Sequence, residues 1–340
     1  MNKMNLLLIF GGESAEHEVS IRSARNVFDA LDKQKYDIDI ELCYIDRNGK
    51  WWLVSAVIEN PQKLGALLPV LGAGKFWIDE PNHAITPDVL FPVLHGPNGE
   101  DGSVQGLAQL LHIPIVGCGI IGSAVCMDKE ITKRLLTRAG ITVAPGVVHH
   151  REDATPVYAE ALEKLGGDAL FVKPANLGSS VGVSKVTDQA SLSKALEEAH
   201  RYDRKVLIER AVKGRELECA VLGNEHPEAS VVGEIMPGDE FYSYDEKYAE
   251  TSNTKTSTRA PLPKETSAKI RAVALAAYKV LECRGLARVD FFLADDGTVY
   301  LNEVNTLPGF TSISMYPQLW KASGLDYSSL LDRLVALSRQ

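Results

Sequence analysis

Residues 286–305 contain two apolar-rich runs separated by an Asp-Gly pair at positions 296 and 297. An Asp-Gly pair between such runs is the strongest short-range signal for a β-hairpin with a two-residue turn. The residues that this turn places opposite each other are Asp290 with Glu303 and Arg288 with Asn305. Because residues two apart on a strand share a face, all four side chains are predicted to project from one side of the hairpin.

The paired carboxylates of this hairpin need a charge partner. Two carboxylates directly opposite each other, Asp290 and Glu303, would lie about 5 Å apart, which is unfavourable unless a cation lies between them. Oxygen atoms of Asp, Glu and Asn are ligands of Mg²⁺, which is usually held together with phosphate oxygens. Asp290, Glu303 and Asn305 are therefore candidate metal ligands. From these residues alone, a solvated sheet face with ordinary charges is the alternative.

Composition restricts the class of protein. A chain of 340 residues is expected to form two or three domains, and a net charge of −9 argues against a nucleic-acid-binding surface. The five cysteines include no C-x-x-C pair, which favours reduced, buried thiols in a cytoplasmic protein. No apolar run reaches the length of about 18 residues that a membrane-spanning helix needs. We therefore expect a cytoplasmic protein with no membrane or nucleic-acid partner.

The first 120 residues alternate between apolar strands and amphipathic helices. The predicted strands are residues 6–10, 38–45, 89–94 and 113–117. Glycine-rich turns follow two of them, as in open parallel α/β sheets. Ligands of such sheets bind at the carboxyl ends of the strands, where Glu16 and His95 lie. From the residues alone, Glu16 could equally be an ordinary acidic residue in the first turn of a helix.

A second motif covers residues 171–183, where a strand ends in Lys173 and a Gly/Ser loop leads into another strand. Glycines let backbone N–H groups approach a polyphosphate, and a lysine supplies positive charge for its oxygens. The motif is not a Walker A loop, because the lysine precedes the loop and no helix follows. A phosphate-binding loop is thus one interpretation, and an ordinary hairpin turn is the other.

A third motif is the apolar strand at residues 206–212, which contains Glu209 and is followed by Glu216. These carboxylates could accept hydrogen bonds from an adenine amino group and from ribose hydroxyls, although a solvated strand end would look the same. Residues 237–263 show no sustained apolar period. A loop of that length within a compact domain is typically a functional lid or disordered.

The three motifs, in this order, resemble the ATP-grasp superfamily, and within it the D-alanine–D-alanine ligase family. The segments that carry the resemblance are GGESAEHEVS (11–20), LHGPNGEDG (94–102), MDK (127–129), VKPANLGSSVGV (172–183), DEKY (245–248), RVDFF (288–292) and LNEVNTLPGFTSIS (301–314). They keep the order of the family, and the resemblance covers about residues 5–337. The resemblance implies an α/β protein in which an N-terminal open parallel α/β sheet domain precedes two ATP-grasp subdomains that clamp ATP between antiparallel sheets.

The implied domains are residues 1–126, with the first D-alanine site, a central subdomain at 127–216 and a C-terminal subdomain at 217–340. The last of these carries the lid loop 237–263 and the metal hairpin 288–305. The ATP residues implied by the resemblance are Lys129, Lys173 and Lys247 for the phosphates, Glu209 for adenine and Glu216 for ribose. Two Mg²⁺ ions, or Mn²⁺, are implied at Asp290, Glu303 and Asn305.

The resemblance also implies residues for the two amino acids. The first D-alanine would be held by Glu16, which is linked by hydrogen bonds through Ser179 and Tyr248, with His95 nearby. Arg288 and the Gly309 backbone resemble the family's oxyanion site. Ser314 and the Met315 backbone resemble the site of the second D-alanine's carboxylate.

The implied reaction is ATP-dependent ligation of two D-alanines through a D-alanyl phosphate, releasing ADP and phosphate, for peptidoglycan precursor synthesis. The expected partners are these small molecules and a second copy of the chain. Tyr248 is typical of ligases that form an amide. Two alternatives are a ligase that takes D-serine or D-lactate second and a non-catalytic nucleotide-binding regulator. The regulator would be expected to have lost a metal ligand or a phosphate lysine.

Overall fold

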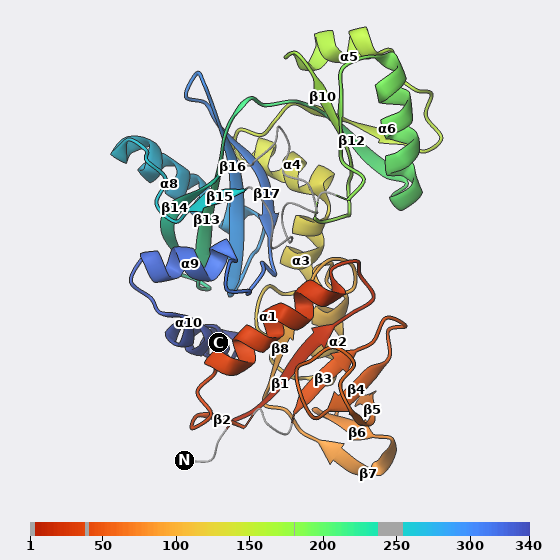
Figure 1. Ribbon diagram of the computed structural model, residues 1–340, viewed down its shortest axis with the longest axis vertical. Helices are drawn as coiled ribbons and strands as arrows, with labels where there is room; N and C mark the ends of the chain where they lie inside the picture. Colours follow the sequence, from red (N-terminus) through yellow and green to blue (C-terminus); the bar gives the residue numbers. More distant parts are fainter. Residues whose placement is uncertain (1–3, 38–40, 180, 237–253) are drawn as a thin grey trace.

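The computed structural model of the chain describes residues 4–37, 41–179, 181–236 and 254–340. Three β-sheets organise the described residues (Figure 1). The N-terminal sheet lies at one end of the elongated molecule, and the other two sheets lie side by side at the opposite end. This arrangement confirms the predicted α/β fold class, and the long helices cover the sheets rather than forming a bundle of their own.

The N-terminal sheet is built on β1 (Met4–Gly11), whose residues 6–10 are completely buried. It pairs in parallel with β2 (Tyr36–Asp37), β3 (Leu42–Ile45) and β8 (Val89–Val93). The helices beside these strands are α1 (His17–Ala30) and α2 (Ser103–Leu111). A continuous apolar run suits a strand that is buried on both faces, so this part of the sheet could be predicted.

The predicted parallel sheet is extended by an antiparallel meander. Its strands are β4 (Trp51–Val54), β5 (Lys63–Val70), β6 (Lys75–Ile78) and β7 (Glu80–Ile85). These strands are partly exposed and lack a clear apolar period, which is why the sequence did not reveal them. The strand predicted at residues 113–117 is reduced to a single parallel bridge between Ile115 and Leu90.

Two helices, α3 (Ile120–Met127) and α4 (Lys129–Arg138), lead from this sheet to the second one. The second sheet has the order β11-β10-β12-β9 and is antiparallel throughout. Its strands are β9 (Gly146–His150), β10 (Leu170–Pro174), β11 (Ser184–Val186) and β12 (Lys205–Arg210). Helices α5 (Tyr158–Leu165) and α6 (Gln189–Tyr202) pack against this sheet and share its apolar core.

The third sheet has the order β15-β14-β13-β16-β17. Its strands are β13 (Gly214–Leu222), β14 (Glu228–Met236), β15 (Lys255–Ser257), β16 (Leu286–Ala294) and β17 (Val299–Asn305). Helix α8 (Lys264–Val280) packs on β13 and β14. The predicted domain boundary after residue 216 falls inside β13, and we propose that it lies instead before Gly214.

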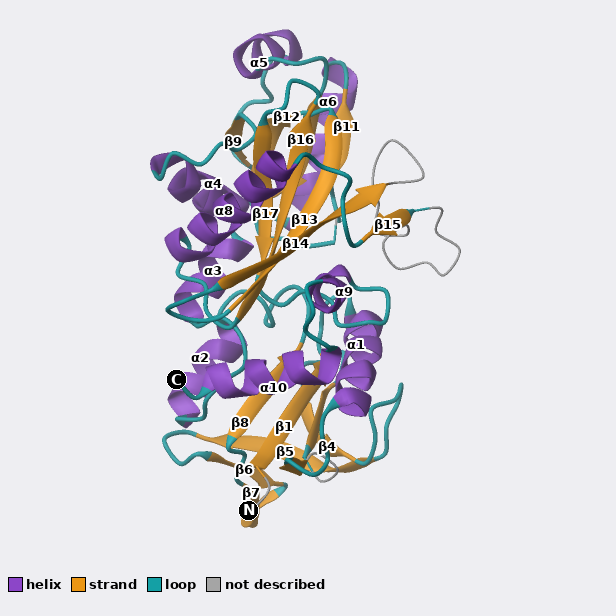
Figure 2. Cartoon of the chain, turned by 90° about the vertical axis from the view of Figure 1, so that its left-hand side faces the viewer, coloured by secondary structure: helices purple, strands orange, loops and turns teal. Residues whose placement is uncertain are grey.

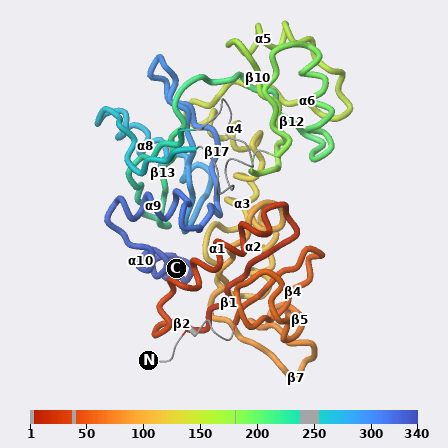
Figure 3. The backbone as a smooth tube through the Cα atoms, viewed as in Figure 1, coloured from red at the N-terminus to blue at the C-terminus, as the bar shows by residue number. Residues whose placement is uncertain are grey.

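The C-terminal helices α9 (Met315–Ala322) and α10 (Tyr327–Ser338) join the third sheet to the first. In the view of Figure 2, α10 crosses in front of β8 and β1, and the tube in Figure 3 ends beside the N-terminal domain. One apolar cluster contains residues of β1, α1, β13, α9 and α10 together. The first and last parts of the chain therefore form a common core, on which the site described next is built.

Candidate active site

The hairpin β16–β17 pairs Asp290 with Glu303 and Arg288 with Asn305, as predicted. The predicted two-residue turn is wrong. Ala294 pairs with Thr298 across a three-residue turn in which Gly297 has a φ of +82°, a conformation that suits glycine. This turn shifts the register by one residue, and a β-bulge next to Asp290 shifts it back.

The carboxylate cluster on this face is larger than predicted. Glu218 of β13 pairs with Asp290 from the other side, so three carboxylates lie in a row across β13, β16 and β17. The sequence signal for Glu218 was its spacing of two residues from Glu216, which puts both on one face of the strand. Glu218 reaches Asp290 because β13 pairs with β16, and sequence patterns do not reveal which strands are neighbours.

Arg288 supplies the positive charge of this cluster. Its guanidinium donates two hydrogen bonds of 2.8 Å to the two oxygens of Asp290, and its Nε lies 3.3 Å from Glu218. Burial lowers the pKa of Arg288, but the neighbouring carboxylates more than offset this and raise it well above its usual value. The amide nitrogen of Asn305 donates to Asp290 as well, at 2.9 Å. Arg288 is therefore the counter-charge of Asp290.

The residues present fit a hard cation such as Mg²⁺. Asp290, Glu303 and Asn305 carry oxygen donors and face the same side of the hairpin. Within the described ranges, no group of three or more His, Cys, Asp or Glu side chains is already arranged as a metal site. Mg²⁺ commonly binds through one or two carboxylates and completes its coordination with substrate phosphates and water. Asn305 would need to turn its amide so that its oxygen faces the ion.

Two of the three predicted phosphate lysines, Lys129 and Lys173, lie in the described part of the chain. Lys129, at the start of α4, donates to the carbonyl of Leu177 at 2.6 Å, and its Nζ lies 3.9 Å from Glu303. Lys173, on β10, lies 2.7 Å from Glu209 on the neighbouring strand β12. The structure thus brings Lys129 to a predicted metal ligand and Lys173 to the predicted adenine residue. Glu216 lies on the same face of β13 as Glu218.

Glu16 and Ser179 meet although they are far apart in the sequence. The hydroxyl of Ser179 donates to a carboxylate oxygen of Glu16, which is buried just before α1. Ser179 has a φ of +53°, a strained conformation for a residue with a side chain. Such strain is typical of loops whose backbone must approach a ligand. Ser180, Lys247, Tyr248 and most of the predicted lid, residues 237–253, lie outside the described part of the chain.

His95 joins the N-terminal sheet to the segment after β17. Its Nδ1 lies 3.1 Å from the carbonyl of Leu307, to which it donates, and Nε2 lies 3.5 Å from the hydroxyl of Ser23. Burial lowers the pKa of His95 and outweighs the nearby charge of Glu16, so the ring is neutral at neutral pH. Ser23 also accepts a hydrogen bond from the backbone N–H of Phe310, at 3.2 Å. These contacts position the segment that contains Gly309.

The predicted second-substrate residues gather at the N-terminus of α9. Ser314 precedes the helix, and its hydroxyl accepts a hydrogen bond of 2.9 Å from the backbone N–H of Thr311. A Cβ at Gly309 would come within 2.7 Å of Ser314 Oγ, so a side chain here would displace the Ser314 hydroxyl. Met315 is the first residue of α9. The free N–H groups and dipole of a helix N-terminus favour a carboxylate here.

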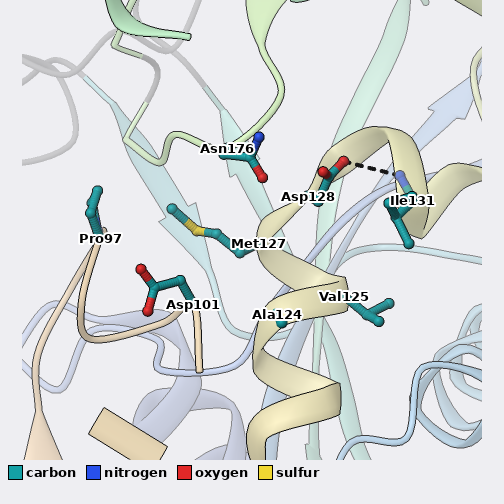
Figure 4. A pocket seen from close by; sticks show the side chains of 8 residues that line it. All are labelled: Pro97, Asp101, Ala124, Val125, Met127, Asp128, Ile131 and Asn176. Carbon is teal, nitrogen blue, oxygen red and sulfur yellow. Dashed lines mark hydrogen bonds between the residues drawn. The ribbon is translucent and has the colours of Figure 1, made fainter. Parts of the chain in front are cut away.

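A pocket of about 550 Å³ lies beside Lys129, between the N-terminal domain and the second sheet. Its lining comes from the loop with Pro97 and Asp101, from the end of α3 and the start of α4, and from Asn176. Figure 4 shows Met127 extending from the helices toward Pro97, and the Asp128 side chain accepting from the N–H of Ile131 at 3.1 Å. The N-terminal sheet, the helical connection and the lysine loop therefore border one space.

Glu100 is a further site residue that sequence reasoning missed. Its Oε2 accepts a hydrogen bond of 2.6 Å from the N–H of Gly96, next to His95. Burial, aided by the negative charge of Glu16, raises the pKa of Glu100 to about 8. Glu100 therefore holds a proton at neutral pH, and it adds no second negative charge beside Glu16. Its presence in the segment 94–102 was visible, but its contacts were not.

This pKa predicts a pH-dependent stability difference for Glu100→Gln. An unfolded glutamate ionises near pH 4.3, whereas folded Glu100 keeps its proton up to about pH 8. Between these values the folded chain binds more protons, so wild-type stability falls as pH rises. Glutamine does not titrate, so we expect the variant to gain about 1 kcal/mol or more over wild type between pH 5 and pH 8. Urea unfolding at both pH values measures this difference.

The control for this prediction is Glu163→Gln, which changes an exposed glutamate of α5. Its stability relative to wild type should not depend on pH over the same interval. A Glu100→Gln difference that stays constant from pH 5 to pH 8 would show that folded Glu100 titrates normally.

Comparison with known proteins places the chain among enzymes of one kind. A family model described as the D-ala D-ala ligase N-terminus matches residues 5–118, and one described as the C-terminus matches residues 135–336. D-alanine–D-alanine ligase A of Chromobacterium violaceum is 48% identical and covers 99% of this chain and 96% of that protein. The ligase A of Escherichia coli K12 is 46% identical, with coverage of 99% and 96%.

Solved structures agree with these sequence matches. The D-alanine-D-alanine ligase of Coxiella burnetii superposes with a TM-score of 0.88 at 38% identity, covering 99% of this chain and 94% of that one. The VanG D-Ala:D-Ser ligase of Enterococcus faecalis also has a TM-score of 0.88, at 37% identity, with coverage of 99% and 100%.

Proposed function

The chain belongs to the D-alanine–D-alanine ligase family, and we propose from its site that it joins two D-alanines at the expense of ATP. The product is D-alanyl-D-alanine, for peptidoglycan precursor synthesis, with ADP and phosphate released. The observation that carries this proposal is the approach of Lys129 to within 3.9 Å of Glu303. This distance supports the proposal because it brings a predicted phosphate lysine beside a predicted metal ligand.

The first step transfers the γ-phosphoryl group of ATP to the carboxylate of the first D-alanine. Positioning and charge neutralisation account for most of the catalysis of such a transfer. Lys129 and Lys173 would bind phosphate oxygens, and Glu209 and Glu216 the adenine and ribose. Asp290, Glu303 and Asn305 would hold Mg²⁺ or Mn²⁺, which supplies positive charge to the phosphates. Lys247 is proposed as a further phosphate ligand from the sequence alone.

The second step is attack by the amino group of the second D-alanine on the D-alanyl phosphate. The tetrahedral intermediate carries an oxyanion, and Arg288 with the Gly309 backbone would stabilise it. Glu16, held by Ser179, would bind the amino group of the first D-alanine, with His95 nearby. Tyr248 completes this group in the proposal. Ser314 and the Met315 N–H would bind the carboxylate of the second D-alanine at the start of α9.

The second substrate is the point on which relatives differ. The ligases named for D-alanine and the ligase named for D-Ala:D-Ser have the same TM-score to this chain, so the backbone fold does not separate them. We propose D-alanine because the sequence relatives reported above carry that name. Release of phosphate from ATP that depends on D-alanine tests the ligase activity. Absence of such release would favour the non-catalytic nucleotide-binding regulator.

We also propose a homodimer in the cytoplasm. Two large apolar side chains, Leu71 and Leu110, are 61% and 58% exposed. The backbone segments that carry them meet, because the N–H of Gly72 donates to the carbonyl of Leu110 at 2.8 Å. Exposed apolar groups that gather in this way favour a protein interface. A sedimentation mass equal to one chain would contradict the dimer.

The proposed cytoplasmic location is supported by the cysteines, because five free, buried thiols favour a reducing compartment. In the described part of the chain, no helix is long and apolar enough to cross a bilayer.

A further inference from the structure

Lys133 is a buried lysine without a role in the reaction proposed above. It follows Lys129 by one helical turn in α4, so both side chains project from the same face of the helix. Only 7% of Lys133 is exposed, and its Nζ lies 2.7 Å from Glu209 Oε1. Burying an ammonium group costs free energy unless the group is paired. The ion pair with Glu209 therefore compensates for the burial of Lys133.

Glu209 lies between two ammonium groups. Its second oxygen, Oε2, is 2.7 Å from the Nζ of Lys173. Burial raises the pKa of Glu209, but the two lysines more than offset this and hold it below its usual value. The carboxylate is therefore ionised, and the cluster of two lysines and one glutamate carries an excess positive charge. A buried site with this charge balance attracts an anion.

Lys133 determines whether Lys173 can leave Glu209 to bind a phosphate. If Lys173 turns toward a phosphate, Glu209 keeps the ammonium group of Lys133 at its other oxygen. If Lys133 were absent, the same movement would leave a buried carboxylate unpaired, because in the described ranges only these two lysines pair with Glu209. Stranding a buried charge is strongly unfavourable. Lys173 would then stay with Glu209 and bind phosphate poorly.

We propose that Lys133 is a nucleotide-positioning residue. It holds the Glu209 carboxylate, so that Lys173 is available to the phosphates of ATP and Glu209 stays in place for the adenine. Lys133 acts through Glu209 and does not touch the nucleotide. The inference rests on the proposed binding of ATP at Lys129 and Lys173.

Titration of ADP and of ATP with Mg²⁺ into four proteins tests this role: wild type, Lys133→Met, Lys133→Arg and Arg134→Met. Arg134 is the next residue of α4. It is exposed and forms an ion pair with Glu130. We expect Lys133→Met to weaken nucleotide binding at least about tenfold. Without Lys133, the buried Glu209 carboxylate would be left unpaired when Lys173 binds a phosphate. Lys133→Arg should restore most of the loss, and Arg134→Met should bind within about twofold of wild type.

Kinetics and stability separate positioning from a purely structural tie between α4 and β12. Lys133→Met should raise KM for ATP and leave KM for D-alanine unchanged. A lower unfolding midpoint with wild-type nucleotide affinity would overturn the proposal, as would an equal loss of affinity in Arg134→Met. If Lys133→Met does not fold, Lys133→Gln carries the same test. Wild-type protein that fails to bind nucleotide at all would refute the proposed function itself, before any variant is compared.

Discussion

Replacing Arg288 with alanine is expected to lower the turnover of D-alanyl-D-alanine formation by about 10²–10³-fold, the loss typical of removing one oxyanion donor. The guanidinium is partly buried and is held by two hydrogen bonds of 2.8 Å to Asp290, so it is fixed before substrate arrives. Fixed donors stabilise a developing charge without reorganisation. The affinity for ADP without metal should stay within about threefold, because Arg288 lies on the hairpin and not among the phosphate lysines.

The variant also removes the counter-charge of Asp290 and Glu218. We therefore expect a lower unfolding midpoint, since breaking a buried ion pair leaves uncompensated charge. The matched control is Arg284→Ala, which removes a surface arginine paired with Glu225 at 3.1 Å, only four residues away in the chain. Turnover is measured per folded protein. If Arg288→Ala turned over like Arg284→Ala, Arg288 could not be the oxyanion ligand.

Replacing Asp290 with asparagine is expected to have the larger effect, a loss of about 10³-fold or more in kcat/KM. Asp290 lies at the centre of the carboxylate row, between Glu218 and Glu303, and it also orients Arg288 and Asn305. The substitution keeps the size of the side chain but removes the charge that a divalent cation needs. Activity should not recover when Mg²⁺ is raised, because the lost donor is part of the site.

The measurement is initial rate against Mg²⁺ concentration, for Asp290→Asn and for Asp295→Asn as its control. Asp295 belongs to the same hairpin but is exposed in the turn. Chelation should abolish wild-type activity, and added Mg²⁺ or Mn²⁺ should restore it. If Asp290→Asn matched the control at every Mg²⁺ concentration, the hairpin would not be the metal site.

The pairing of Asp290 with Glu303 depends on two local deviations that cancel. The Asp-Gly pattern predicts a two-residue turn, but the chain forms a three-residue turn that offsets the strands by one position. The bulge next to Asp290 returns the register, so that both carboxylates share one face. A one-residue slip without the bulge would turn Glu303 to the opposite face. The period-two pattern of the strands thus predicted the shared face correctly, whereas the Asp-Gly pair predicted the wrong turn length.

The sequence offered candidate site residues within contiguous motifs, but it could not offer those whose proposed role depends on distant contacts. Lys129 and Lys173 were visible as candidates in their motifs. Glu218 and Lys133 were not, because their contacts with Asp290 and Glu209 follow from strand order and from helix placement against a sheet. The pKa of Glu100 likewise depends on burial created by several segments. Hydrophobic periodicity indicates which side chains of one segment are buried, but not which residues of distant segments come into contact.

The central claim is that this site joins D-alanine to D-alanine with ATP, and product analysis tests it most directly. The protein is incubated at neutral pH with ATP, Mg²⁺ and an equal mixture of D-alanine, D-serine, D-lactate and L-alanine, and the products are identified by mass. We expect D-alanyl-D-alanine to dominate, together with phosphate released in equal amount. Dominance of any other product, or phosphate release that does not depend on D-alanine, would contradict the account.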